Sequence, residues 1–212
     1  MWIASQPQRN RMQTLPIFLA SNSPRRRELL TQIGVSFDVV IPDIDETPLP
    51  SEHAADYVCR MAKEKASAAW QRLPDIEKQG RLLLAADTCV VLDDQVLGKP
   101  QDGADAAQML SRYAGRSHEV MTAVAVTDGR TLRVDNVVTT VQFRPLSHAE
   151  IAAYVETGEP MDKAGAYGIQ GLAALFVTHL EGSYTGVMGL PLYETGQLLS
   201  QFGYDVLPRT LD

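Results

Sequence analysis

Cysteine is scarce in this sequence: its 212 residues contain only Cys59 and Cys89. Two cysteines are too few for a disulfide scaffold, and their spacing matches no zinc site. No run approaches the roughly 20 apolar residues of a membrane span, and the mostly polar residues 1–14 lack the apolar stretch of a signal peptide. We therefore expect a cytoplasmic protein with reduced thiols, no membrane partner and a flexible N-terminal extension over residues 1–14.

Basic residues are in the minority, with 19 Lys and Arg against 26 Asp and Glu, so the net charge is −7. Non-specific nucleic-acid binding depends on a basic surface that releases counterions, so we expect no nucleic-acid partner. Basic side chains that converge in one cleft could still bind a polyanion. The 45% of apolar residues is enough for one sizeable core, and residues 15–212 are predicted to form a single domain.

The order of apolar runs and turn residues predicts an α/β fold with one mixed, strongly twisted sheet. Ser51, Ser147 and Pro191 stand where helices are expected to begin, and Ser147 with Glu150 forms a capping box. Strands are expected at residues 17–20, 37–41, 82–92, 96–97, 119–127, 132–143 and 172–180. Helices are expected at residues 23–33, 51–72, 104–113, 147–156 and 192–202.

The first strand-to-helix turn, residues 21–27, reads Ser-Asn-Ser-Pro-Arg-Arg-Arg. A helix N-terminus presents free N–H groups and a partial positive charge, which suit a phosphate. Three arginines there oppose the helix dipole, an objection that a bound polyphosphate would remove, and Arg can grip phosphate oxygens bidentately. The alternative is that the three arginines extend into solvent.

Asp87 lies inside the apolar run of residues 84–91. A carboxylate in such a strand is costly unless it is paired, hydrogen-bonded or bound to a metal, so Asp87 is a candidate general base or metal ligand. A structural Asp that caps a neighbouring loop is the alternative. Strand alternation puts Thr88 on the opposite face, so both can serve one site only if the strand ends or bulges there.

Three further segments carry weaker signals. Lys99 lies in a tight turn and could reach a phosphate, although a solvated turn lysine is the more frequent explanation. The acidic cluster at residues 43–46 offers oxygen ligands for Mg²⁺ or Mn²⁺, or it is a solvated loop. The glycine-rich residues 162–171 allow close approach of a ligand, and Gln170 could pair with the edge of a base, unless this is only a structural turn.

Together these residues resemble the Maf family of nucleotide pyrophosphatases, and the resemblance covers residues 19–202. Each segment is weak alone, but five in the right order are highly specific. The segments that carry it are 19–30 (LASNSPRRRELL), 86–88 (ADT), 97–100 (LGKP), 162–171 (DKAGAYGIQG) and 182–192 (GSYTGVMGLPL). The loop at 163–171 is similar to the branch that acts on dTTP and UTP. Thr185-Gly186 departs from the Asn-containing pair that is frequent in that branch, which leaves the geometry of that loop open.

The resemblance implies an ITPase-like α/β fold, an elongated mixed sheet whose helices form two lobes around a central cleft. It implies hydrolysis of a nucleoside triphosphate to the monophosphate and pyrophosphate with a divalent cation, Mg²⁺ or Mn²⁺. By similarity, Asp87 is the proton acceptor, and Glu46 and Asp87 are candidate metal ligands. The remaining roles are substrate choice for Arg25, Thr88 and Gln170, and phosphate binding for Ser21, Arg26, Lys65 and Lys99.

A nucleotide-binding regulator of septum formation or cell division, without significant turnover, is the alternative function. A homodimer is compatible with the resemblance. The preference among dTTP, UTP and modified nucleotides stays open, as does the choice between nucleotide house-cleaning and a signalling role.

Overall fold

A seven-stranded mixed sheet forms the centre of the protein, in a computed structural model that describes residues 15–207. The predicted N-terminal extension at residues 1–14 lies outside the described residues. The strands follow the order β2-β1-β3-β5-β6-β7, with β4 also paired to β3. They are β1 (Ile17–Ala20), β2 (Phe37–Val39), β3 (Leu83–Leu92), β4 (Gln95–Leu97), β5 (Ser117–Thr127), β6 (Leu132–Phe143) and β7 (Val177–Glu181).

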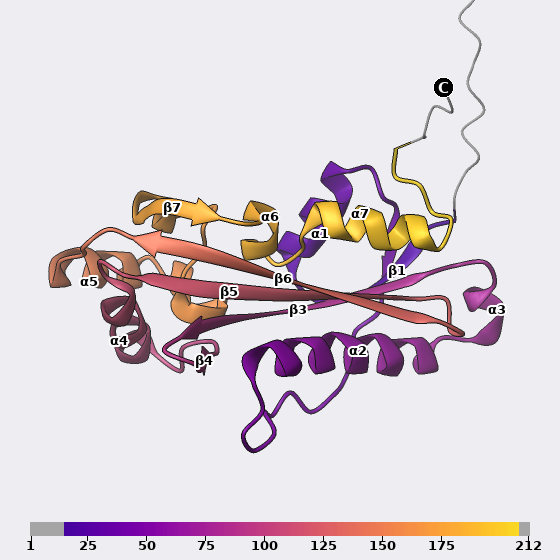
Figure 1. The fold of residues 1–212 in the computed structure, drawn as a ribbon, viewed down its shortest axis with the longest axis horizontal. Coiled ribbons are helices and arrows are strands. Elements are labelled where there is room, and N and C mark those ends of the chain that lie inside the picture. The colour runs from indigo at the N-terminus through magenta and orange to yellow at the C-terminus, as the bar shows by residue number, and fades with distance from the viewer. Residues whose placement is uncertain (1–14, 208–212) are drawn as a thin grey trace, which may run out of the picture.

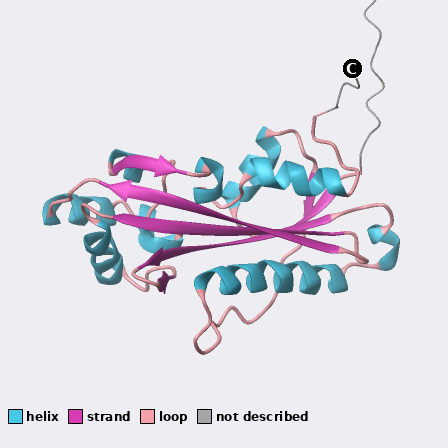
Figure 2. Cartoon of the chain, in the orientation of Figure 1, coloured by secondary structure: helices cyan, strands magenta, loops and turns pink. Residues whose placement is uncertain are grey.

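Helices flank this sheet on both faces and at both ends (Figures 1 and 2). They are α1 (Pro24–Gln32), α2 (Ala54–Arg72), α3 (Asp75–Lys78), α4 (Gly103–Tyr113), α5 (His148–Glu156), α6 (Tyr184–Val187) and α7 (Leu192–Gln201). Figure 1 shows α2 along one face, α1 and α7 on the other, and α4 with α5 at the far end. Within residues 15–207, no helix has the length and apolar character needed to cross a membrane.

Strand β3 belongs to all three apolar cores, because successive side chains point to opposite faces of a sheet. Leu84 and Ala86 pack with α1 and α7, whereas Ala85 and Cys89 pack with α2. Further along, Val90 joins a separate core with α4 and α5. The long strands therefore connect two lobes of an elongated molecule, and the predicted ITPase-like α/β fold is confirmed.

One edge of β3 is open in its middle. Strand β1 pairs with β3 at Leu83–Ala85, and β4 pairs along the same edge only from Val90 to Leu92, while β5 occupies the opposite edge throughout. Residues 86–89 of β3 consequently have no neighbouring strand on the β1 side. This gap lies where the two lobes meet.

Two local predictions were wrong. Ser51 does not cap α2: its φ of +58° is left-handed, and the helix begins at Ala54 after His53. The strand expected at 172–180 begins only at β7, because Leu172–Leu175 forms a 3₁₀ turn whose first N–H donates to Glu159 Oε2 at 3.0 Å. The capping box of Ser147 with Glu150 is confirmed.

Candidate active site

A cleft of about 510 Å³ opens beside the gap in β3, and both lobes line it. Eight of the nine predicted site residues are on its wall: Ser21, Arg25, Arg26, Glu46, Lys65, Asp87, Thr88 and Lys99. They come from five separate segments of the chain. The β1–α1 turn together with the first turn of α1 supplies Ser21 and the two arginines. The β2–α2 loop supplies Glu46, α2 supplies Lys65, β3 supplies Asp87 and Thr88, and the turn after β4 supplies Lys99.

Asp87 is paired with a buried lysine. Lys65 Nζ lies 2.7 Å from Asp87 Oδ1 and 3.0 Å from Glu46 Oε1, so one ammonium holds two carboxylates. Asp87 is only 7% exposed and Lys65 only 8%. The cost of placing a carboxylate in this apolar strand is thus offset by an ion pair. The same pairing aims Glu46 and Asp87 at a common point in the cleft.

Arg26 is the second charged centre. Its guanidinium donates to the Gly189 carbonyl at 2.8 Å through Nε, to Ser21 Oγ at 3.2 Å and to Thr88 Oγ1 at 3.2 Å. Within residues 15–207 these hydrogen-bond acceptors are all uncharged. Burial lowers the pKa of Arg26, and the Asp87 carboxylate opposes that shift. A largely desolvated cation held by neutral acceptors is well placed to bind an anion that enters the cleft.

Asp87 and Thr88 do lie on opposite faces of β3, but the strand neither ends nor bulges between them. Its register with β5 is unbroken, with Asp87 opposite Ala123 and Thr88 opposite Thr122. Both side chains reach one cleft because β3 has no partner strand at residues 86–89. The expected break in regular strand structure is therefore found in the strands beside β3, where β1 ends and β4 begins, and not in β3 itself.

Sequence reasoning missed two residues that hold this arrangement. Thr122 Oγ1 lies 3.0 Å from Thr88 Oγ1 and donates to the Gly186 carbonyl at 2.8 Å, which links β3, through Thr122 of β5, to α6. Gly189, with φ +111°, turns its carbonyl toward Arg26. Thr122 interrupts an apolar run of β5, the same signal that singled out Asp87, and could have been found in that way.

The loop left open by Thr185 is now defined. The Thr185 hydroxyl accepts from the backbone N–H of Leu192 at 3.0 Å, the first residue of α7, and so satisfies one of the free N–H groups at that helix terminus. The departure from the Asn-containing pair thus leaves the start of α7 capped.

The remaining predicted residues are arranged less tightly. Arg25 lines the cleft and lies 3.8 Å from Asp162, and Lys99 is an exposed side chain at the rim. Arg27 is not part of the wall. Gln170 is exposed and is not among the lining residues, so its role in substrate choice stays a prediction.

The three carboxylates of the acidic cluster at residues 43–46 have different surroundings. Asp43 pairs with Arg72, and Asp45 accepts from the backbone and hydroxyl of Thr47. Only Glu46 faces the cleft. The other two carboxylates have partners outside the cleft, Asp43 on α2 and Asp45 within the loop.

The donor set can be compared with the needs of a divalent cation. Residues 15–207 contain no group of three or more His, Cys, Asp or Glu side chains arranged to hold a metal. However, Mg²⁺ is ordinarily bound through one or two carboxylates plus substrate phosphate oxygens and water. Glu46 and Asp87 supply such a pair, and a cation already lies between them as the Lys65 ammonium. The residues therefore fit a cation that arrives with its phosphorylated ligand.

A partly buried guanidinium that faces a lysine-bridged carboxylate across an open strand edge is suited to a polyanionic ligand and places a candidate general base beside it. The chain belongs to the Maf family: the sequence model of the Maf-like protein family matches residues 16–202. It is 53% identical to a dTTP/UTP pyrophosphatase of Chromobacterium violaceum, over 90% of this chain and 96% of that protein. Proteins of the same name match from Aromatoleum aromaticum (53% identity, 89% and 96% coverage) and Pasteurella multocida (49%, 92% and 100%).

Proposed function

We propose that this protein hydrolyses dTTP and UTP to the nucleoside monophosphate and pyrophosphate. The names of relatives that are about half identical over nearly their whole length support the reaction and the substrates. One structural observation carries the proposal for the site. The Arg26 guanidinium, with only uncharged acceptors within the described residues, and the Asp87–Lys65 pair reach the same cleft from the two faces of β3.

The triphosphate would lie along the β1–α1 turn. Arg26 keeps a rigid, planar donor set directed into the cleft, and Ser21 lies within hydrogen-bond distance of it. Arg25 and Lys99 bring further positive charge to the rim. Because the arginine is already desolvated and oriented by its neutral acceptors, little reorganisation is needed when phosphate charge develops in the transition state.

Asp87 would orient and deprotonate the attacking water. Its contact with Lys65 goes to Oδ1, and no other residue between 15 and 207 donates a hydrogen bond to Oδ2. That oxygen can therefore accept from a water in the cleft. Attack at the α-phosphorus would release pyrophosphate, whose charge the basic side chains compensate. Positioning and charge stabilisation supply most of the rate in such phosphoryl chemistry.

Glu46 and Asp87 would hold the divalent cation, Mg²⁺ or Mn²⁺. Such an ion neutralises phosphate charge and orients the reacting groups. The protein's own contribution is to place both carboxylates at one point, through Lys65 and the packing of α2 on β3. A cytoplasmic location, a homodimer and a role in nucleotide house-cleaning stay predictions.

A substrate panel tests the proposal. The protein is incubated with dTTP, UTP, 7-methyl-GTP and the common nucleoside triphosphates plus Mg²⁺ or Mn²⁺, and pyrophosphate is assayed. We expect dTTP and UTP to be the best substrates, and Asp87→Asn to lower kcat by orders of magnitude while leaving the fold intact. Asp43→Asn is the matched control, because that carboxylate is exposed and pairs with Arg72 outside the cleft.

The outcomes separate the two candidate functions. Binding of dTTP without release of pyrophosphate would favour the nucleotide-binding regulator. Turnover by Asp87→Asn at a near-normal rate would contradict the role of Asp87 and leave the activity itself in place.

A further inference from the structure

The loop that carries Glu46 has little apolar support. Residues 40–53 connect β2 to α2 without a strand or helix, and a connection of this length is uncommon unless it serves a function. Two of its larger apolar side chains, Ile41 and Leu49, are each 55% exposed, whereas Val40 packs against the core under α2 and Ile44 is half-buried. Because apolar packing is limited to the first residues of the loop, polar contacts hold the part that carries Glu46.

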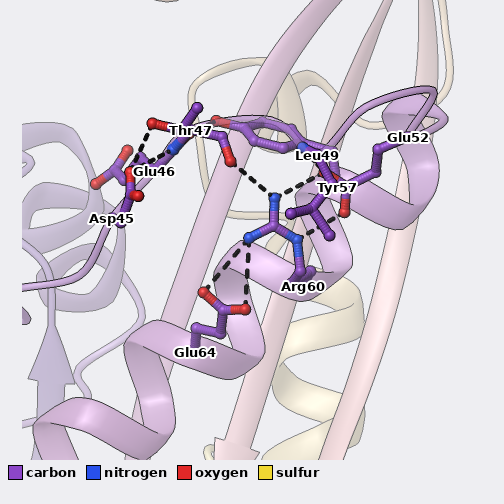
Figure 3. Close-up of polar contacts among 8 residues, drawn as sticks. All are labelled: Asp45, Glu46, Thr47, Leu49, Glu52, Tyr57, Arg60 and Glu64. Carbon is purple, nitrogen blue, oxygen red and sulfur yellow. Dashed lines mark hydrogen bonds and ion pairs between the residues drawn. The ribbon is translucent and has the colours of Figure 1, made fainter.

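One arginine of α2, Arg60, supplies three of those contacts (Figure 3), and Arg72 of the same helix holds the start of the loop through the Ile41 carbonyl and Asp43. Arg60 grips Glu52 bidentately, with Nε 2.6 Å from Oε1 and Nη2 2.7 Å from Oε2. Its Nη2 also donates to the Thr47 carbonyl at 3.1 Å, the residue directly after Glu46. Glu52 in turn accepts from the backbone N–H of Leu49 at 3.0 Å. Arg60 thus fixes the loop both through a side chain and through its backbone.

The backbone of Glu46 is fixed from the same helix. The Tyr57 hydroxyl donates to the Glu46 carbonyl at 3.0 Å, next to the Arg60 contact at Thr47. Both acceptors are main-chain oxygens on consecutive residues, so together they set the position and direction of the backbone at Glu46. Its carboxylate then meets Lys65, which α2 also carries. A single helix therefore holds the loop and presents the lysine that the loop must reach.

We propose that Arg60 is a positioning residue for Glu46, clamping the loop onto α2 so that the Glu46 carboxylate faces Asp87 and Lys65 in the cleft. The proposal rests on the function proposed above, in which Glu46 is a metal-side residue. Arg60 is not part of the cleft wall, so the proposal gives it no contact with substrate or cation. Its effect reaches the site only through the loop.

The first measurement examines the clamp without any ligand. Arg60→Met keeps the apolar stem and removes the guanidinium, and hydrogen exchange of the free protein reports on residues 42–53. We expect faster exchange in this segment and unchanged exchange in β3 and β5. Glu64→Gln is the matched control, because Glu64 contacts Arg60 only at 3.4–3.5 Å and is not in the loop. Unchanged exchange in Arg60→Met would overturn the clamp.

The second measurement asks whether the clamp acts through Glu46. We expect Arg60→Met to raise the Mg²⁺ concentration for half-maximal dTTP hydrolysis roughly 10- to 100-fold, the usual effect of removing a support of a metal ligand. Arg60→Lys should recover part of this loss, and Glu64→Gln should match the wild type. In a Glu46→Gln background, Arg60→Met should add almost nothing. Full additivity there, or a loosened loop with unchanged Mg²⁺ dependence, would overturn the positioning role.

Failure of the proposed function is distinguishable from failure of the clamp. If the wild type hydrolyses no nucleotide, the exchange measurement is unaffected, and the same variants are compared for Mn²⁺-dependent binding of dTTP by calorimetry. Weaker binding in Arg60→Met that disappears in the Glu46→Gln background then supports the clamp. Equal binding in all variants contradicts it.

Discussion

Replacement of Lys65 by methionine should destabilise the protein strongly and in a way that depends on Asp87. The lysine ammonium lies 2.7 Å from Asp87 Oδ1 and 3.0 Å from Glu46 Oε1, at the boundary between α2 and β3. Methionine keeps the apolar stem that packs beside β3 and removes only the charge. The variant therefore isolates the contribution of the ammonium.

The burial of the two ion pairs determines how much free energy of unfolding Lys65→Met should lose. Removal of one partner from a buried ion pair costs about 3–5 kcal/mol, because the other charge stays buried without compensation. The Glu46 side chain is 57% exposed, so its pair with Lys65 contributes little. We expect the free energy of unfolding at pH 7 to fall by about 3 kcal/mol, the lower end of that range. The double variant Lys65→Met with Asp87→Asn should recover most of this loss, because the amide carries no charge.

The assay is urea unfolding of the wild type, both single variants and the double variant, followed by circular dichroism in the presence of EDTA and without nucleotide. Repetition with excess Mg²⁺ adds a second comparison. A divalent cation should stabilise Lys65→Met more than the double variant, since it can replace the ammonium between the two carboxylates. The reasoning fails if Lys65→Met unfolds within about 0.5 kcal/mol of the wild type, the range of ordinary surface substitutions, or if the losses simply add.

Two other substitutions address Arg26 in the cleft wall and the buried His118 outside it. Arg26→Lys cannot reproduce the contacts of the guanidinium with Ser21, Thr88 and the Gly189 carbonyl, so kcat/KM for dTTP should fall about 10²- to 10³-fold, as for loss of one oriented transition-state donor. Arg27→Lys is the control, because Arg27 lies outside the cleft wall, and its kcat/KM should match that of the wild type. Equal losses in both variants would contradict the role of Arg26. His118 is buried with its Nε2 2.7 Å from the Tyr167 hydroxyl, and burial lowers its pKa from 6.5 to about 4. As the pH falls, His118 is therefore protonated in the unfolded chain before it is protonated in the folded protein. The stabilisation that neutral His118 provides above pH 6.5 is lost in this range, so the free energy of unfolding should fall by about 3 kcal/mol as the pH falls to 4 and below. The difference in unfolding free energy between wild type and His118→Gln at pH 7 and pH 4 measures this contribution, and a pH-independent difference would contradict it.

Local sequence signals were sufficient for much of the fold and for the two charged centres. The apolar, β-rich runs of β3 and β5, the Ser147 capping box and the turn before α1 depend on near neighbours, so they can be read without tertiary structure. Asp87 was found because a carboxylate in an apolar strand requires a partner. The identity of that partner, Lys65, could not be predicted from local sequence signals.

Lys65 shows why the rest could not be read locally. On a helix a lysine usually points to solvent, and its burial here results from the packing of α2 over a strand that begins 18 residues later in the chain. The open edge of β3 likewise depends on where β1 and β4 stop pairing, which no property of residues 86–89 encodes. The Arg60 clamp joins a helix to a loop with no regular pattern, so it too required the structure.

The most direct test of the account is hydrolysis of dTTP in ¹⁸O-labelled water with Mg²⁺, followed by mass spectrometry of both products. Attack at the α-phosphorus by a water that Asp87 activates predicts one ¹⁸O in the nucleoside monophosphate and none in pyrophosphate, with the signal greatly reduced in Asp87→Asn. Label in pyrophosphate, or orthophosphate and dTDP as the products, would contradict the proposed placement of the triphosphate in the cleft.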